Sequence, residues 1–221
     1  MSESDKNKEH NNKVHKCPTE GENYENPQII LLAKETTDII KKEIKLTKDS
    51  IIFDFGAGTG LLGLEFINQV KHVIFEDVSK VMLDYLQYKC ETKGIKNYTI
   101  FNGIIEDYKT KEKVDLITAG MVVHHVEDLK SLFSKFLEIL KPGGYVCIVD
   151  LYKDAPMFNI GGHKHHHVMP HKGFIPEDLC EELKKAGFVN TEIKEVSSIN
   201  FKGADGKDII SKRFMIIAQG P

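Results

Sequence analysis

The sequence has few of the features that mark membrane, secreted or nucleic-acid-binding proteins. None of its apolar runs approaches the roughly 18 residues of a membrane-spanning helix, and its first residues are too polar for a signal peptide. The formal net charge of -3 leaves no basic excess that would suggest nucleic acid. We therefore expect no membrane and no nucleic acid among the partners of this protein.

Cysteine is also scarce, and its spacing forms no recognisable pair. Cys17, Cys90, Cys147 and Cys180 include no C-x-x-C motif, and Cys90 and Cys147 fall in apolar patterns. Thiols of this kind are typically reduced core residues. The sequence therefore predicts a cytoplasmic protein.

The composition divides the chain into a tail and one domain. Residues 1–26 are mostly charged or amide side chains, which bury too little surface to offset the entropy of ordering them. Residues 27–221 are long enough for a single large α/β domain with a substantial core. We expect a mobile N-terminal tail that is able to fold over the site, followed by one domain.

Apolar runs alternate with helical patterns along that domain, and this order defines the expected fold. Strands alternating with helices predict a doubly wound α/β fold. We expect a mostly parallel, seven-stranded sheet with helices on both faces and an antiparallel C-terminal strand. The expected strands are 51–55, 72–76, 98–101, 114–119, 145–149, 189–196 and 213–218, and the expected helices begin near residues 27, 61, 79, 129 and 176, with a loop at 151–172.

A glycine-rich turn follows the first strand, and two ligands compete for it. Gly58, Gly60 and Gly63 spell the G-x-G-x-x-G fingerprint of dinucleotide sites, which is weak when taken alone. Asp54 opposes that interpretation, because a carboxylate before the turn repels a pyrophosphate and suits a cation. A glycine-rich turn without any ligand is the third possibility.

Acidic and apolar residues follow the next two strands at the edge where an open parallel sheet binds ligands. Asp77 is placed to accept hydrogen bonds from ribose hydroxyls, or alternatively to cap the helix that begins at Ser79. Ile104 and Ile105 follow the third strand, where they would either sandwich an adenine or pack in the core.

Histidines gather after the fourth strand and in the loop at 151–172. His124 and His125 are adjacent at a strand-to-helix junction, and His171 closes a run of five histidines within residues 163–171. A working histidine here would orient an acceptor or take its proton, whereas a lone histidine is as often a packing residue. We expect no metal site, because the run contains no acid or thiol, and we interpret it as a substrate-covering loop.

Together these segments resemble a known family. The D-x-G-x-G-x-G turn from Asp54 to Gly60, the D-V-S sequence from Asp77, the strand before His124-His125 and the Lys141-Pro142-Gly143-Gly144 segment resemble motifs of small class I S-adenosylmethionine-dependent methyltransferases. The similarity is to the type 11 and type 12 groups with ubiquinone-biosynthesis-like members, and it covers about residues 27 to 219. It implies a Rossmann-like sheet, S-adenosyl-L-methionine as cofactor and methyl transfer by in-line displacement.

The resemblance also implies roles for individual residues. Asp54, Gly56, Gly58 and Gly60 would hold the methionine end and sulfonium region, and Asp77 would bind the ribose. Ile105 and Glu106 would lie at the adenine, and Met121 near the methyl group. The chain departs from the family at Ile104, where an Asp is common, so that Glu106 or a backbone carbonyl would replace that contact. His124, His125 and His171 would be the candidate catalytic residues.

The expected function is methyl transfer to a small-molecule acceptor. Two alternatives stay open at this point: an NAD(P)-dependent oxidoreductase that uses the same glycine turn, and a non-catalytic binding or regulatory protein that keeps the fold. The sequence names neither the acceptor, nor the atom that would be methylated, nor the oligomeric state.

Overall fold

The computed structural model describes residues 24–159, 169–203 and 206–221, with the side chains of residues 158 and 159 left out. They form a seven-stranded sheet of order β3-β2-β1-β4-β5-β7-β6, in which β7 runs antiparallel to both β5 and β6 and every other pair is parallel. The predicted sheet is confirmed, including its antiparallel strand. The strands are β1 (Ile51–Phe55), β2 (His72–Asp77), β3 (Tyr98–Asn102), β4 (Val114–Gly120), β5 (Leu140–Leu151), β6 (Val189–Lys202) and β7 (Asp208–Gln219).

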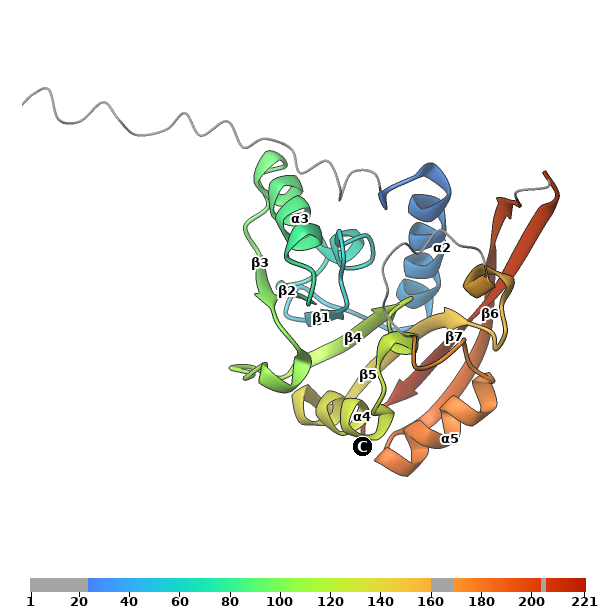
Figure 1. Ribbon diagram of the computed structural model, residues 1–221. Coiled ribbons are helices and arrows are strands. Elements are labelled where there is room, and N and C mark those ends of the chain that lie inside the picture. Colours follow the sequence, from blue (N-terminus) through green and yellow to red (C-terminus); the bar gives the residue numbers. More distant parts are fainter. Residues whose placement is uncertain (1–23, 160–168, 204–205) are drawn as a thin grey trace, which may run out of the picture.

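Helices cover both faces of this sheet (Figure 1). Helices α4 (Leu129–Ile139) and α5 (Pro176–Ala186) bury their apolar stripes on one face, and α2 (Pro27–Glu43) and α3 (Lys80–Thr92) bury theirs on the other. β1 lies between them and is buried along its whole length, as an apolar central parallel strand should be. Because helices cover both faces, we look for the ligand site at the edge of the sheet where the carboxyl ends of the strands lie.

The segment after the glycine turn differs from the expectation. Residues 61–70 were expected to form a helix, but the structure has only turns and a short 3₁₀ helix, η2 (Gly63–Phe66). The N–H groups of Glu65, Ile67 and Gln69 each donate to the carbonyl three residues earlier. Within these turns Gly63 packs closely against β2, since a Cβ there would lie 2.4 Å from the Phe75 ring. The helix prediction was wrong, and no long helix dipole points at the turn.

The other elements match their predictions with shifted ends. β6 and β7 extend beyond the predicted 189–196 and 213–218 and form a long hairpin. Lys141 to Gly144 belong to β5 instead of to a separate turn, and they form an irregularity in its pairing with β4. The pattern of apolar residues does not define the ends of strands well, because backbone pairing continues through polar residues wherever a neighbouring strand is available.

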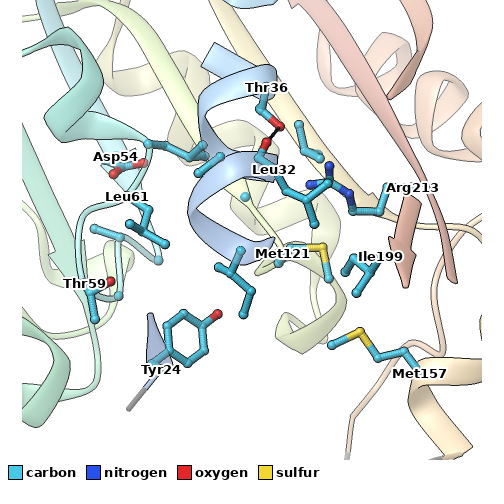
Figure 2. A pocket seen from close by; sticks show the side chains of 18 residues that line it. Tyr24, Leu32, Thr36, Asp54, Thr59, Leu61, Met121, Met157, Ile199 and Arg213 are labelled. Atoms are coloured by element: carbon cyan, nitrogen blue, oxygen red, sulfur yellow. Dashed lines mark hydrogen bonds between the residues drawn. The ribbon is translucent and has the colours of Figure 1, made fainter. Parts of the chain in front are cut away.

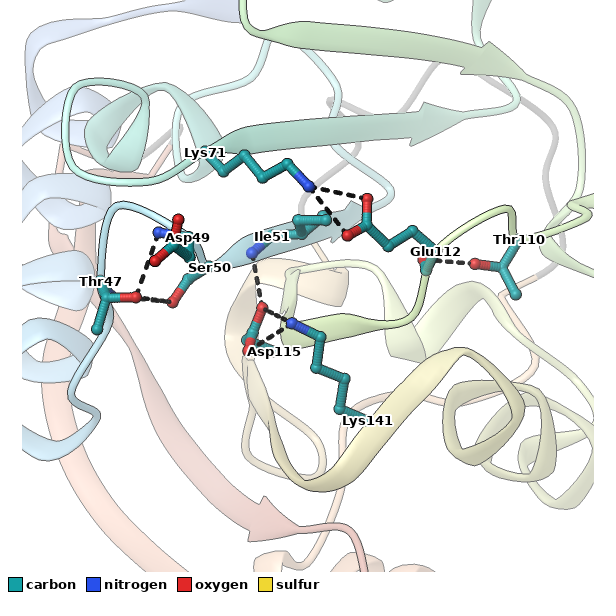
Figure 3. Close-up of polar contacts among 9 residues, drawn as sticks. All are labelled: Thr47, Asp49, Ser50, Ile51, Lys71, Thr110, Glu112, Asp115 and Lys141. Atoms are coloured by element: carbon teal, nitrogen blue, oxygen red, sulfur yellow. Dashed lines mark hydrogen bonds and ion pairs between the residues drawn. The ribbon is translucent and has the colours of Figure 1, made fainter.

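Polar side chains at the amino ends of the strands are paired with one another (Figure 3). Asp115 Oδ2 accepts the N–H of Ile51 at 2.7 Å and lies 2.8 Å from Lys141 Nζ, which ties β1, β4 and β5 together. Lys71 and Glu112 form an exposed ion pair nearby. This edge of the sheet is a polar seam that holds strands together.

The predicted tail lies almost entirely outside the described residues. Its last residues are described: Asn26 caps α2 by accepting the N–H of Ile29 at 3.0 Å, and Glu25 pairs with Lys89 of α3. Within the described ranges, none of the helices has the length and apolar character needed to cross a bilayer.

Candidate active site

A cavity opens at the carboxyl edge of the sheet, under α2 (Figure 2). It encloses about 800 Å³ of space, part of which is open to solvent. One wall is the glycine turn after β1, and the opposite wall is apolar and comes from the ends of β5, β6 and β7 with η5 (Pro156–Asn159). The lining residues are Tyr24, Ile29, Leu32, Ala33, Thr36, Asp54, Gly56, Ala57, Gly58, Thr59, Leu61, Leu62, Gly120, Met121, Val149, Met157, Ile199 and Arg213.

The glycine turn exposes backbone to this cavity. Gly56 and Gly58 have φ values of 60° and 53°, in the left-handed region that favours glycine. A Cβ on Gly56 would lie 2.2 Å from Val122, so the residue is fixed by packing. A Cβ on Gly58 would meet nothing within 4 Å, so the space beside it is available to a ligand.

Asp77 is both braced and accessible. Its Oδ2 accepts the N–H of Gly58 and its Oδ1 accepts the N–H of Ser79, each at 2.7 Å. Ser79 itself is the N-cap of α3. Both earlier interpretations of Asp77 therefore have a structural basis: it supports the start of the helix, and a carboxylate has further lone pairs for ligand hydroxyls.

Two more carboxyl groups lie buried behind the turn. Asp54 accepts Thr118 Oγ1–H at 2.6 Å and the Gly63 N–H at 2.9 Å. Burial raises its pKa to about 6, and the charge of Asp77 adds to the rise. Glu76 Oε2 accepts the Gly56 N–H at 3.1 Å, and burial, followed by the neighbouring acids, raises its pKa to about 8.

Burial is the main cause of both raised pKa values, and repulsion from neighbouring carboxylates adds to it. A positive ligand relieves the repulsion among carboxylates, whereas a pyrophosphate adds to it. With a pKa of about 8, Glu76 is mostly uncharged at neutral pH, so the electrostatic argument continues to depend on Asp54. The residues fit the sulfonium and ammonium of S-adenosylmethionine.

The predicted adenine residues lie in the loop after β3. Ile105 begins η3 (Ile105–Asp107) and its side chain is buried in the core, so it can offer an adenine mainly its backbone. Glu106 is exposed, and Ile104 is 51% exposed, which makes Ile104 the apolar side chain available at this position. Adenine contact by this loop stays a prediction.

Met121 lies where β4 meets the cavity, and its backbone is unusual. Its φ of 57° is in the left-handed region, which a non-glycine residue adopts at a cost of about 1 kcal/mol or more. Its N–H donates to the carbonyl of Val149 at 2.8 Å. This conformation directs the side chain into the apolar wall beside Met157 and Ile199 (Figure 2).

The three predicted catalytic histidines lie together, but none of them lines the described cavity. His124 is buried, with Nδ1 at 2.7 Å from Asp150 Oδ1 and its N–H donating to Asp150 Oδ2. The His125 ring lies 4.2 Å from that of His124, and the His171 N–H donates to the carbonyl of His124 at 3.3 Å. Their catalytic role stays a prediction.

Sequence reasoning missed several residues at this edge. Asp150 is fully buried near the end of β5 and binds the ring of His124. The only sequence signal for Asp150 was its position at the end of a strand. α2 supplies a large part of the cavity wall, and its amphipathic pattern gave no sign of that. Arg213 was also missed, although it is the only arginine in the sequence.

Metal ligands do not cluster in the described part of the chain. No group of three or more histidine, cysteine, aspartate or glutamate side chains there is arranged to hold an ion. Most of the histidine run lies in residues 160–168, outside the described residues. The absence of a metal site, and the covering role of this loop, remain predictions.

Comparison with known proteins supports the fold and the family. The model of a methyltransferase domain family matches residues 52–144. An uncharacterized methyltransferase of Schizosaccharomyces pombe is 25% identical over 182 residues, which are 77% of this chain and 64% of that protein. A ubiquinone biosynthesis O-methyltransferase of Aeromonas salmonicida is 24% identical over 160 residues, 68% of this chain and 66% of that one. The crystal structure of YcgJ from Bacillus subtilis has a TM-score of 0.69 at 15% identity, covering 85% of this chain and 98% of that one.

The sheet, the acidic glycine turn and the cavity beside it define a Rossmann-like, class I S-adenosylmethionine-dependent methyltransferase fold. Residues 52–144 match the methyltransferase domain family, whose methyl donor is S-adenosylmethionine. This match favours S-adenosylmethionine over a dinucleotide as the ligand of the turn. The chain spans less than two thirds of the length of the two curated relatives described above.

Proposed function

We propose that this protein transfers the methyl group of S-adenosylmethionine to a small-molecule acceptor by in-line displacement. The observation that supports this most is the continuity of the cavity: one chamber runs from the glycine turn to the apolar wall of Met121, Met157 and Ile199. A chamber of this kind brings a ligand at the glycine turn next to a ligand at the apolar wall. Relatives named (S)-coclaurine N-methyltransferase, from Papaver somniferum, and arsenite methyltransferase, from Rattus norvegicus, are named for small acceptors.

The chain's contribution is mostly positioning. S-adenosylmethionine supplies a methyl group on a positive sulfur, so the carbon–sulfur bond breaks with its electron pair going to sulfur as the bond to the acceptor forms. Asp77 holds the ribose, Gly58 lets the cofactor lie against the backbone, and Asp54 maintains a negative field near the sulfonium. Alignment of this kind is worth several kcal/mol of the barrier in general.

The histidines are proposed to act on the acceptor side. His124 follows Met121 closely and is fixed by Asp150, so its ring has a defined orientation near the end of β4. The proposal for His124, His125 and His171 is that one of them orients the acceptor or removes its proton. Single His→Ala variants that keep full turnover would remove that histidine from the mechanism.

Binding and transfer are tested separately. Isothermal calorimetry with S-adenosylmethionine, S-adenosylhomocysteine and NAD should show binding of the first two and none of the third. Labelled-methyl transfer into a metabolite extract should then give labelled small molecules. Tight cofactor binding without transfer to any extract would favour a non-catalytic role, and binding of NAD alone would contradict the proposal.

A further inference from the structure

The apolar wall of the cavity contains one buried cation. Arg213 lies on β7 opposite Leu151, the last residue of β5, and is 5% exposed. Its Nε–H donates to the carbonyl of Ser197 at 2.8 Å, which fixes the plane of the guanidinium. Its Nη2 is buried and has no hydrogen-bond partner among the described residues. The side chain points into the cavity (Figure 2).

A buried charged group with an unpaired hydrogen-bond donor destabilises the folded protein unless a partner accepts that hydrogen bond. Hydrogen bonds to charged groups are stronger than those between neutral groups, and a buried charge that lacks them is disfavoured. Burial lowers the pKa of Arg213 to about 10, which still leaves the group charged at neutral pH. The guanidinium is thus a charged donor in an apolar wall.

Glu35 of α2 is the acidic group whose charge acts on Arg213, but it does not complete the guanidinium. No ion pair within 4 Å joins them among the described residues, and Glu35 Oε2 is likewise buried without a partner. The Nη2 group of Arg213 is therefore available to donate to a ligand that enters the cavity.

The strand order places Arg213 away from the cofactor's ribose. Asp77 ends β2, whereas Arg213 lies on β7, beyond β1, β4 and β5. With neighbouring strands about 4.8 Å apart, β7 lies on the order of 14 Å from the glycine strand β1. The neighbours of Arg213 in the wall are instead Leu32, Met121 and Ile199.

We infer that Arg213 anchors the methyl acceptor, and that the acceptor is a monoanionic carboxylate with an apolar body. This deepens the proposed function and rests on it. The guanidinium carries a single positive charge, and its unpaired Nη2 can donate to a carboxylate, which carries a single negative charge. The apolar wall then contacts the body of the acceptor, and the anchored end lies away from the reacting atom.

The direct test uses binding to the protein already loaded with S-adenosylhomocysteine, so that it does not depend on turnover. The probes are octanoate and phenylacetate, each compared with its methyl ester, on the wild type, Arg213→Gln, Arg213→Lys and Lys212→Gln. Gln keeps a donor toward Ser197, and Lys212 is an exposed cation on the same strand, which makes it the matched control. Calorimetry and the thermal midpoint are the readouts.

We expect the acids, and not the esters, to bind the wild type and Lys212→Gln. Arg213→Gln should weaken acid binding about tenfold or more, and Arg213→Lys should weaken it less. Equal binding of acids and esters, or equal acid binding by wild type and Arg213→Gln, would overturn the inference. So would a tenfold loss of S-adenosylhomocysteine affinity in Arg213→Gln, because the anion would then be the cofactor's own carboxylate.

The outcome also separates this inference from the proposed function. If the wild type and Arg213→Gln transfer labelled methyl groups equally well, the protein is a methyltransferase but Arg213 does not bind the acceptor. If the wild type binds neither S-adenosylmethionine nor S-adenosylhomocysteine, the proposed function itself fails.

Discussion

The two edges of the same sheet treat polar groups in opposite ways. At the amino edge, Asp115 is fully engaged by Lys141 and the Ile51 N–H, and Lys71 meets Glu112. At the carboxyl edge, buried polar atoms are left without partners. Within the described ranges, the buried side-chain atoms that lack a hydrogen bond are on Glu35, Thr59, His171 and Arg213. Thr59 and Arg213 line the cavity, Glu35 belongs to α2, and His171 lies beside His124.

This difference indicates which edge is built for ligands. Native proteins pair nearly all their buried polar groups, so a cluster of exceptions calls for an explanation. The raised pKa values of Asp54 and Glu76 lie at the same edge. Acids with perturbed pKa values and unpaired buried donors are frequent at functional sites. The comparison therefore locates the site independently of any family resemblance.

The largest expected effect comes from removing a charge at each edge. Asp77→Asn should weaken S-adenosylhomocysteine binding about tenfold or more, because the amide loses acceptor capacity toward the ribose and toward the N–H groups of Gly58 and Ser79. Asp115→Asn is the matched change at the amino edge. It should lower the free energy of unfolding by about 1–2 kcal/mol and leave cofactor affinity unchanged.

Calorimetry and urea unfolding of both variants check this contrast. If Asp115→Asn weakens cofactor binding as much as Asp77→Asn does, the two edges are coupled and the contrast between them fails.

A smaller effect is expected from filling the space beside Gly58. Gly58→Ala and Gly94→Ala place a methyl group at positive φ, 53° and 67°, with nothing within 4 Å in either case. Both should cost about 1 kcal/mol of stability from backbone strain. Only Gly58→Ala should also weaken cofactor binding, because only its methyl group projects where the ligand lies. Equal cofactor affinity in the two variants would show that the cofactor does not approach Gly58.

How far the sequence predicts this edge depends on whether a feature is local. The strand β1, the turn to Gly60 and the acid at Asp77 follow from short patterns. Both oxygens of Asp77 accept backbone N–H groups, which agrees with its support of the helix start, while ribose binding stays a prediction. The helix at 61–70 failed because its apolar spacing is helical while the approach of Gly63 to Asp54 and Phe75 is not encoded locally. Tertiary packing overrode the pattern.

The features that define the cavity are not local at all. Arg213 lines the cavity because β7 inserts antiparallel beside β5. Asp150 of β5 contacts His124, which follows the neighbouring strand β4. Burial of Glu76 depends on the same assembly. No window of sequence around these residues contains that information, although the presence of a single arginine is a compositional signal that could have been used.

The pH dependence of stability provides a third comparison. The pKa of Glu76 is 4.5 in a model peptide and is raised to about 8 in the folded protein. Between these values the folded state binds more protons than the unfolded state, so the free energy of unfolding falls as pH rises from about 5 to 8. Glu76→Gln should remove part of this slope, on the order of 1–3 kcal/mol across the range.

Glu112→Gln makes the same chemical change at the amino edge and should keep the wild-type slope. Urea unfolding at several pH values from 5 to 8 measures all three proteins. A Glu76→Gln profile parallel to that of the wild type would mean that the buried carboxyl group is not perturbed as described.

The smallest expected effect concerns the exposed ion pair at the amino edge, whose contribution to stability should be that of an ordinary surface pair. Lys71 and Glu112 are 50% and 57% exposed in an ion pair of 2.9 Å. Exposed pairs of this kind contribute about 0.2–1 kcal/mol, and salt screens them. A double-mutant cycle of Lys71→Gln and Glu112→Gln, measured by urea unfolding at low and high salt, should give a coupling energy in that range that shrinks with salt. A coupling well above it would mean that the amino edge stores more electrostatic energy than surface pairing explains. The contrast between the two edges would then be one of degree.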